Sequence, residues 1–145
     1  MPPLPSHLTE RRKAVPVDRL LPAEGRKGRR PSWPSGHEPT EAEARLWARL
    51  WKLPQAVAWA DLPGVAELVE RYTRVAVRVA ADLDAGTVMA ATLAQLRGME
   101  TDLGLNPPGL AKLRWQIAPA TPPKPAPTVA PMRPRRMRAP VTEAP

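Results

Sequence analysis

The chain has 145 residues, with 22 Lys and Arg against 14 Asp and Glu, and therefore a formal net charge of +8. It has 21 Pro and no Cys, which excludes disulfide bonds and thiolate metal sites. Charged residues interrupt every apolar stretch, so no segment is predicted to span a membrane. The length allows one ordinary domain, and these properties predict a basic protein of the cytoplasm.

Charge and proline divide the chain into three parts. Residues 1–39 hold 8 basic residues, 4 acidic residues and 8 Pro, whereas residues 40–118 hold 9 basic, 9 acidic and 4 Pro. Residues 119–145 hold 5 basic residues, 1 acidic residue and 9 Pro. Because proline disrupts helices and strands, we predict a disordered basic arm over 1–39 and a disordered Pro/Arg-rich tail over 119–145. The neutral middle, 40–118, is predicted to be a helical core and oligomerisation domain.

The first predicted helix follows Thr40. Thr40 and Glu43 have the spacing of a capping box, in which each residue accepts a hydrogen bond from the backbone of the other. The helix is predicted to continue to about Lys52, and a short turn or helix is predicted to start at Pro54.

The longest predicted helix spans residues 65–83, where apolar residues recur at three- and four-residue steps. Such a stripe usually packs against the core or another subunit. Four residues on it are predicted to mediate helix packing, within or between subunits: Leu68, Tyr72, Val75 and Val79.

Two further helices complete the predicted middle. Gly86 breaks the chain, Thr87 is predicted to cap the next helix, and Gly104 suits its left-handed end. Asn106 followed by Pro107 predicts the start of a last short helix. The result is an all-α fold, a small bundle of four to five helices without a convincing strand. A core of this size favours subunit association.

The sequence shows no convincing catalytic chemistry. It lacks both the G-x-x-x-x-G-K-[ST] phosphate loop and the G-x-G-x-x-G dinucleotide motif. Two acidic pairs, Asp82 with Asp84 and Glu100 with Asp102, could hold Mg²⁺, but a solvated helix end is the favoured interpretation because neither pair has a third ligand. We therefore predict no catalytic residue, no metal site and no cofactor.

The basic residues of the two ends are the strongest functional signal. Arginine presents a planar fork of donors that suits phosphate, and neutralising a nucleic-acid backbone releases its counterions. The alternative is a solubilising tail. The residues predicted to bind DNA are Arg11, Arg12, Lys13, Arg26, Lys27, Arg29, Arg30, Arg133, Arg135, Arg136 and Arg138. Trp33 lies between them and the core, where docking on the helical body is favoured over stacking on a base.

Several short motifs follow one another along residues 19–117. They are Leu21-Pro22-Ala23-Glu24-Gly25, Pro31 to Pro34 around Trp33, Leu46-Trp47, Leu50-Trp51, Pro54-Gln55-Ala56, Trp59, the run from Leu103 to Leu110, and Leu113-Arg114-Trp115. In order and spacing the chain resembles the small subunit of tailed-bacteriophage terminases, of the type found in phages of high-GC bacteria. That family more often has Thr or Ser at the position of Asn106, and Asn caps a helix equally well.

This resemblance implies a non-catalytic DNA-binding adaptor in the cytoplasm of the bacterial host cell. Terminase small subunits form helical rings, bind double-stranded phage DNA at the packaging start, and recruit and regulate the large subunit, which carries the ATPase and nuclease. The C-terminal arginines would then contact either DNA or the large subunit. Deleting residues 1–34 is expected to weaken DNA binding.

Two alternatives belong to other functional classes. Residues 40–62 could form a helix-turn-helix, which would make the chain a monomeric transcriptional regulator or an RNA-binding adaptor. The acidic pairs could instead serve a metal-dependent nuclease.

Overall fold

The computed structural model describes residues 17–121. Within this range there are five helices: α1 (Glu41–Leu50), α2 (Gln55–Trp59), α3 (Val65–Asp84), α4 (Ala90–Asp102) and α5 (Pro107–Leu113). Two three-residue strands flank them, β1 (Arg19–Leu21) and β2 (Trp115–Ile117). The prediction of a mostly helical fold is confirmed for these residues. None of their helices is both long and apolar enough to cross a membrane.

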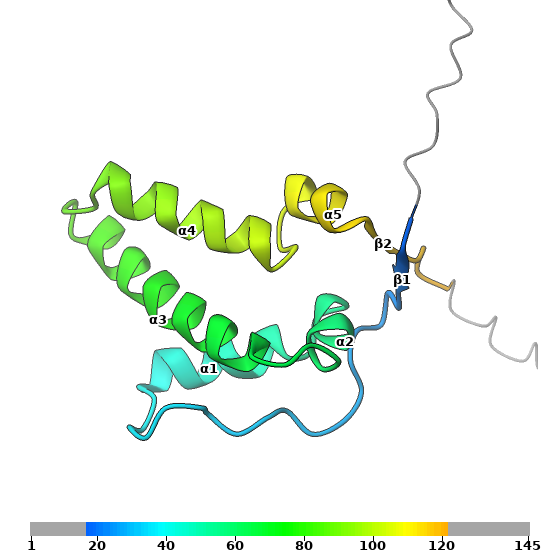
Figure 1. Cartoon of the computed structure of the whole chain (residues 1–145). Helices are drawn as coiled ribbons and strands as arrows, with labels where there is room; N and C mark the ends of the chain where they lie inside the picture. Colours follow the sequence, from blue (N-terminus) through cyan, green and yellow to red (C-terminus); the bar gives the residue numbers. More distant parts are fainter. Residues whose placement is uncertain (1–16, 122–145) are drawn as a thin grey trace, which may run out of the picture.

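The longest helix, α3, packs against α1 on one side and α4 on the other (Figure 1). Helices α3 and α4 form an antiparallel hairpin whose tip lies far from α2 (Figure 1). Of the four residues predicted for helix packing, Val79 is buried, whereas Leu68, Tyr72 and Val75 are half-buried on α3. Their packing between subunits stays a prediction.

Side-chain caps mark the starts of two of the five described helices, α1 and α5. The Thr40 hydroxyl accepts from the Glu43 amide at 3.3 Å, and the Glu43 carboxylate accepts from the Thr40 amide at 2.8 Å, which confirms the capping box. The Asn106 side chain accepts from the Gly109 amide at 2.8 Å. Thr87 does not cap α4, because its hydroxyl instead donates to the Asp82 carbonyl at 3.4 Å and closes α3. As a result α4 starts later, at Ala90.

The two strands correct the prediction of a fold without strands. They pair in parallel, with Arg19 opposite Trp115 and Leu21 opposite Ile117. Each strand is too short to show an alternating pattern, and the partners come from opposite ends of the described chain. Local sequence patterns could not reveal this pairing.

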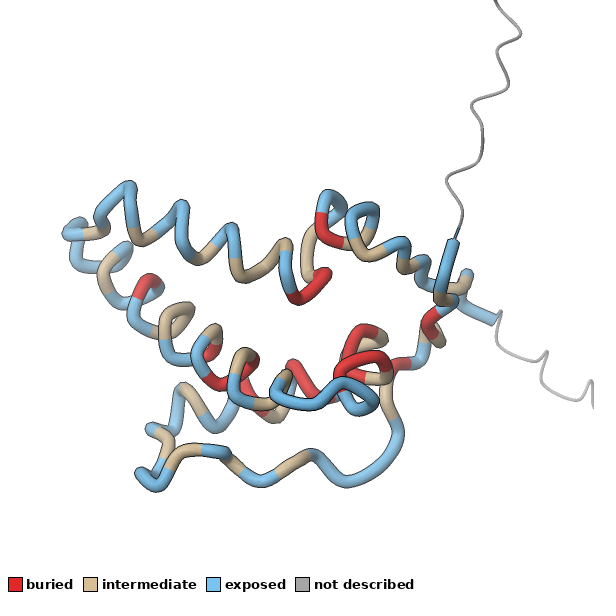
Figure 2. Tube along the Cα trace, in the orientation of Figure 1, coloured by how far each residue is buried: buried red, intermediate tan, exposed pale blue. Residues whose placement is uncertain are grey.

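The core is built around tryptophans. Trp33, Trp47, Trp51 and Trp59 form a chain of edge-to-face contacts, with successive ring centroids 5.1, 5.5 and 5.7 Å apart. Buried residues gather where α1, α2 and the first turns of α3 meet, whereas α4 contains no buried residue (Figure 2). Edge-to-face aromatic pairs of this kind stabilise a core beyond their buried area.

Residues 17–39 correct the predicted boundary of the folded part. They contain no helix, as their proline content predicts, but they lie on the helical body rather than extending away from it. Leu21 is completely buried, and the Arg26 amide donates to the Lys52 carbonyl at 3.2 Å. Trp33 docks against Trp47, as the sequence favoured. Proline and glycine prevent helix formation here, but they do not prevent packing. The residues predicted to form the rest of the arm and the C-terminal tail, 1–16 and 122–145, lie outside the described range.

Candidate nucleic-acid interface

Four of the predicted DNA-binding residues lie in the described segment between β1 and α1, and they have different environments. The Arg26 guanidinium lies 5.6 Å from the centroid of the Trp51 ring and donates to the Arg29 carbonyl at 3.0 Å, so it braces the segment. Lys27 is exposed, with its ammonium 3.8 Å from the Glu24 carboxylate. Arg29 and Arg30 line a cavity instead. The other predicted residues, Arg11, Arg12, Lys13, Arg133, Arg135, Arg136 and Arg138, lie outside the described residues.

This cavity, which we call the basic cavity, lies between residues 28–33 and α1. Its volume is about 800 Å³. Arg29, Arg30 and Lys52 contribute its cations, and Trp33, Trp47 and Trp51 contribute an aromatic wall. No acidic side chain lines it. The cavity therefore combines positive charge with an apolar surface.

Lys52 is a candidate binding residue that the sequence did not indicate. It follows α1 in a neutral part of the chain, with no adjacent basic residue. It reaches the other cations because the chain packs closely at Gly25, where an added Cβ would lie 1.9 Å from the Lys52 carbonyl oxygen. Gly25 also has a φ of +78°, which favours glycine. A glycine in a basic segment is a weak signal for such a contact.

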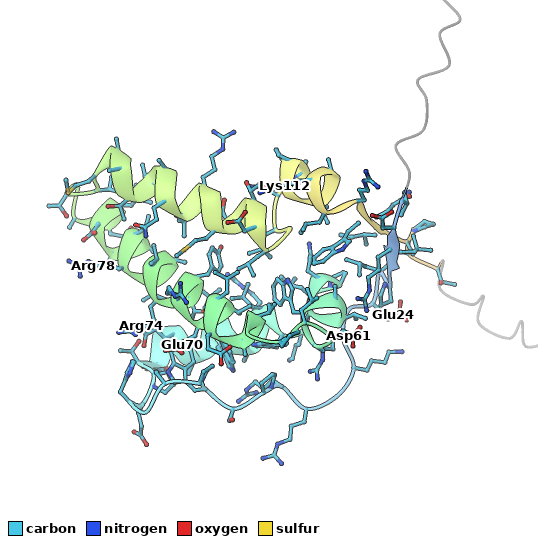
Figure 3. All side chains as sticks on the ribbon, in the orientation of Figure 1. Glu24, Asp61, Glu70, Arg74, Arg78 and Lys112 are labelled. Atoms are coloured by element: carbon cyan, nitrogen blue, oxygen red, sulfur yellow. The ribbon has the colours of Figure 1, made fainter. Side chains whose placement is uncertain are left out.

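Most other cations of residues 17–121 are paired within the chain. Lys112 lies 3.0 Å from Asp102, Arg74 lies 3.8 Å from Glu70 and Arg78 lies 4.0 Å from Asp82 (Figure 3). Arg19, Arg45 and Arg114 are paired as well. Within the same range, Arg29, Arg30 and Lys52 make no ion pair. Arg26, Arg49, Arg71 and Arg97 also make none, but Arg26 donates to the Arg29 carbonyl and the other three are distributed over three helices.

One indole N–H of the tryptophan core has no partner among the described residues. The indole N–H groups of Trp33, Trp47 and Trp59 donate to Ser35, Pro31 and Leu103 at 2.8, 3.2 and 3.1 Å. The buried Nε1 of Trp51 has no acceptor in the described structure. Leaving such a donor unpaired costs about 1–3 kcal/mol.

The acidic pairs make other contacts. Asp82 faces Arg78, Asp102 faces Lys112, and Glu100 lies 3.5 Å from the hydroxyl of Tyr72. Burial and, secondarily, the Glu100 carboxylate raise the pKa of the Tyr72 hydroxyl, while Arg49 opposes this shift. Among residues 17–121, no three His, Cys, Asp or Glu side chains gather in an arrangement that could hold a metal ion.

Residues 40–62, which could have supplied a helix-turn-helix, form α1 and α2. Helix α2 has five residues and buries four of them: Gln55, Ala56, Ala58 and Trp59. A recognition helix must present side chains to a DNA groove. In this fold α2 is part of the core, which argues against that role.

The chain matches no protein-family model, no curated protein and no solved structure. The terminase interpretation therefore rests on the motifs of the sequence, and the fold shows what those motifs do. Gln55 donates to the Gly104 carbonyl at 3.0 Å and Trp59 donates to the Leu103 carbonyl, which joins two motif segments in the core. These motifs thus chiefly specify packing in the core, whereas the candidate interface lies at the surface.

Proposed function

We propose that this protein is a non-catalytic DNA-binding adaptor of the terminase small-subunit kind, which recognises viral DNA at the packaging start and recruits the large subunit. The observation that carries the proposal is that three cations without an ion pair among the described residues line one cavity: Arg29 and Arg30 on the segment braced by Arg26, and Lys52 after α1. Cations without intramolecular partners are free to pair with phosphates, and the release of DNA counterions then drives binding. The basic residues in segments 1–16 and 122–145 add to this charge.

Subunit association is the second part of the proposal. Apolar side chains near the tip of the hairpin are uncovered: Leu83 is 53% exposed, Met89 67% and Leu93 39%. Exposed apolar side chains that gather at one end of a fold are candidates for an interface. A closed ring would bring many copies of the cation group to one DNA molecule, and weak contacts then gain from their effective concentration.

DNA binding is tested by point substitution rather than by deletion. Deleting residues 1–34 would remove the buried Leu21 and the contacts of Gly25, so it would damage the fold as well as the charge. We expect the double substitution Arg29→Gln/Arg30→Gln to weaken binding to a duplex. The slope of log affinity against log salt should also fall, by about 0.9 for each phosphate that the variant no longer neutralises.

Arg71→Gln is the matched control, because Arg71 is an exposed, unpaired arginine of α3 that lies outside the basic cavity. It should leave the salt slope nearly unchanged. Equal slopes for the wild type and the double variant would refute the assignment of Arg29 and Arg30.

Association is tested by measuring mass in solution by light scattering. The wild type is expected to be a ring-sized oligomer, and Leu93→Glu is expected to shift it to smaller species without changing the helix content. A wild-type monomer would instead favour the transcriptional regulator or RNA-binding adaptor. Co-purification with a product that carries ATPase and nuclease domains tests the packaging role.

A further inference from the structure

The basic cavity has more structure than binding to a duplex backbone requires. Surface arginines alone would suffice to contact phosphates. Here the two arginines and Lys52 surround a space that has indole rings on one side. One of these rings, Trp33, is fixed by a 2.8 Å hydrogen bond to Ser35 and by its edge contact with Trp47. The wall is therefore organised before any ligand arrives.

We propose that the basic cavity binds one unpaired nucleotide, with the phosphate at Arg29, Arg30 and Lys52 and the base against the half-buried ring of Trp33 in the aromatic wall. The choice of nucleic acid over an acidic protein segment rests on the proposed DNA-binding function. The proposal adds that the site takes a base, and not only a backbone.

Three features of the cavity favour a nucleotide. Its cations match a phosphate, since arginine presents a fork of donors and lysine a compact positive charge. Its half-buried Trp33 ring matches a base, because stacking on an aromatic side chain contributes about 1–3 kcal/mol per base, whereas Trp47 and Trp51 are only 3% and 2% exposed. Its volume of about 800 Å³ lies in the range of small-molecule sites.

A base within a duplex cannot use this wall. Its faces are covered by its neighbours in the stack, and only its edges and the phosphates are accessible from outside. A nucleotide at a strand end, in a single-stranded stretch or free in solution has an uncovered face. The site is therefore specific for the unpaired state.

The experiment compares ligands that carry equal charge but differ in the base. The full-length protein is titrated with a thymidine tetranucleotide and with the same tetranucleotide made abasic. Thymidine monophosphate and a 20-base-pair duplex are the further ligands. Tryptophan fluorescence reports occupancy of the cavity, and anisotropy of a labelled ligand reports affinity. We expect the thymidine tetranucleotide to quench the fluorescence and to bind about tenfold more tightly than the abasic one, within the range that stacking of one base provides.

Ala44→Leu tests the role of the cavity's space independently of its charge. Ala44 is an exposed residue of α1 that lines the cavity, so leucine there narrows the space without changing charge or disturbing the core. It should remove the preference for the thymidine tetranucleotide while the affinity for the duplex changes less than twofold. Ala94→Leu, at an exposed position of α4 outside the cavity, is the matched control and should preserve the preference.

The outcomes distinguish this inference from the proposed function. Equal binding of the thymidine and abasic ligands, with duplex binding intact, would overturn the nucleotide site alone. Failure of the wild-type protein to bind any of these DNA ligands would overturn both the nucleotide site and the proposed DNA-binding function. A glutamate-rich peptide that quenches the fluorescence as strongly as the tetranucleotide would also overturn the nucleotide site. Monophosphate binding as tight as that of the tetranucleotide would support the site and identify a free nucleotide as its ligand, whereas tighter tetranucleotide binding identifies a strand.

Discussion

The two ends of α3 are packed very differently. Its first half contains the completely buried Val69 and Thr73, of which Val69 belongs to the tryptophan core. Its second half buries Val79 but forms the hairpin with α4, where Leu83 and Met89 are exposed and α4 buries no residue (Figure 2). One helix thus holds a folded core together at one end and presents exposed apolar side chains at the other. In the proposed oligomer, the hairpin end is the part that a partner would cover.

The largest expected effect is at the tryptophan end. Trp59→Ala removes a side chain that is 2% exposed and whose N–H donates to the Leu103 carbonyl at 3.1 Å. Truncating a buried tryptophan in this way costs about 3–5 kcal/mol, which is a large part of the stability of a small domain. Urea denaturation followed by circular dichroism measures the loss.

Leu93→Ala gives the contrast at the hairpin end. Because Leu93 on α4 is already exposed in a single chain, its truncation should change the free energy of unfolding by less than about 1 kcal/mol at concentrations where the protein is monomeric. Comparable losses for Trp59→Ala and Leu93→Ala would contradict the division of the molecule into two differently packed ends.

Substitutions at two glycines, one near each end, test the same contrast with smaller expected changes in the free energy of unfolding. Gly25→Ala places a Cβ 1.9 Å from the Lys52 carbonyl oxygen at a positive φ, so the backbone must move. We expect a loss of about 1–3 kcal/mol, and because residues 25–30 carry Arg29 and Arg30, weaker DNA binding should accompany it.

Gly98→Ala tests the same substitution in α4. An added Cβ there meets no atom within 4 Å, and the residue lies inside a helix. Alanine should therefore stabilise the helix by about 0.5–1 kcal/mol. Thermal denaturation should show a lower melting temperature for Gly25→Ala and a higher one for Gly98→Ala. Destabilisation by Gly98→Ala would show that α4 is more tightly covered than its exposure indicates.

Local signals predicted most of the helical fold. The capping box at Thr40, the Asn106-Pro107 start and the long stripe of α3 depend on neighbours three or four residues apart, so the sequence contains all the information needed. The β1–β2 pair depends on contacts between Leu21 and Ile117, at opposite ends of the described chain. Local sequence patterns do not predict this pair. For this reason the predicted disordered arm extends to residue 39 and includes the packed residues 17–39.

The candidate site was predicted in part for the same reason. Arg29 and Arg30 stand in a dense basic run, and their charge alone marked them as candidates. Their grouping with Lys52 depends on the close approach at Gly25, which a linear pattern does not contain. The sequence also treated Arg26, Lys27, Arg29 and Arg30 as equivalent, and only the fold separates the bracing Arg26 from the two arginines at the cavity.

The smallest expected effect concerns the pKa of Tyr72, which lies on α3 between the tryptophan core and the hairpin tip. Tyr72 is the single tyrosine of the chain, and its hydroxyl on α3 lies 3.5 Å from Glu100 on α4. Burial, reinforced by the Glu100 carboxylate, raises its pKa above the ordinary value of about 10. Absorbance at 295 nm follows this one phenol, so the folded protein should titrate above the midpoint measured in concentrated urea.

The raised pKa also has a consequence for stability. Below about pH 10 the phenol is neutral in both states, and its contribution to folding is complete. As the pH rises further, the unfolded chain ionises first, so stability is lost as the pH approaches the folded pKa. Tyr72→Phe should flatten this loss, and Glu100→Gln should move the folded midpoint toward the ordinary value, because both the charge and the acceptor for the phenol are weakened. A folded midpoint equal to that in urea would mean that α4 does not cover Tyr72 in solution, and that the uncovered surface extends from the hairpin tip to the edge of the tryptophan core.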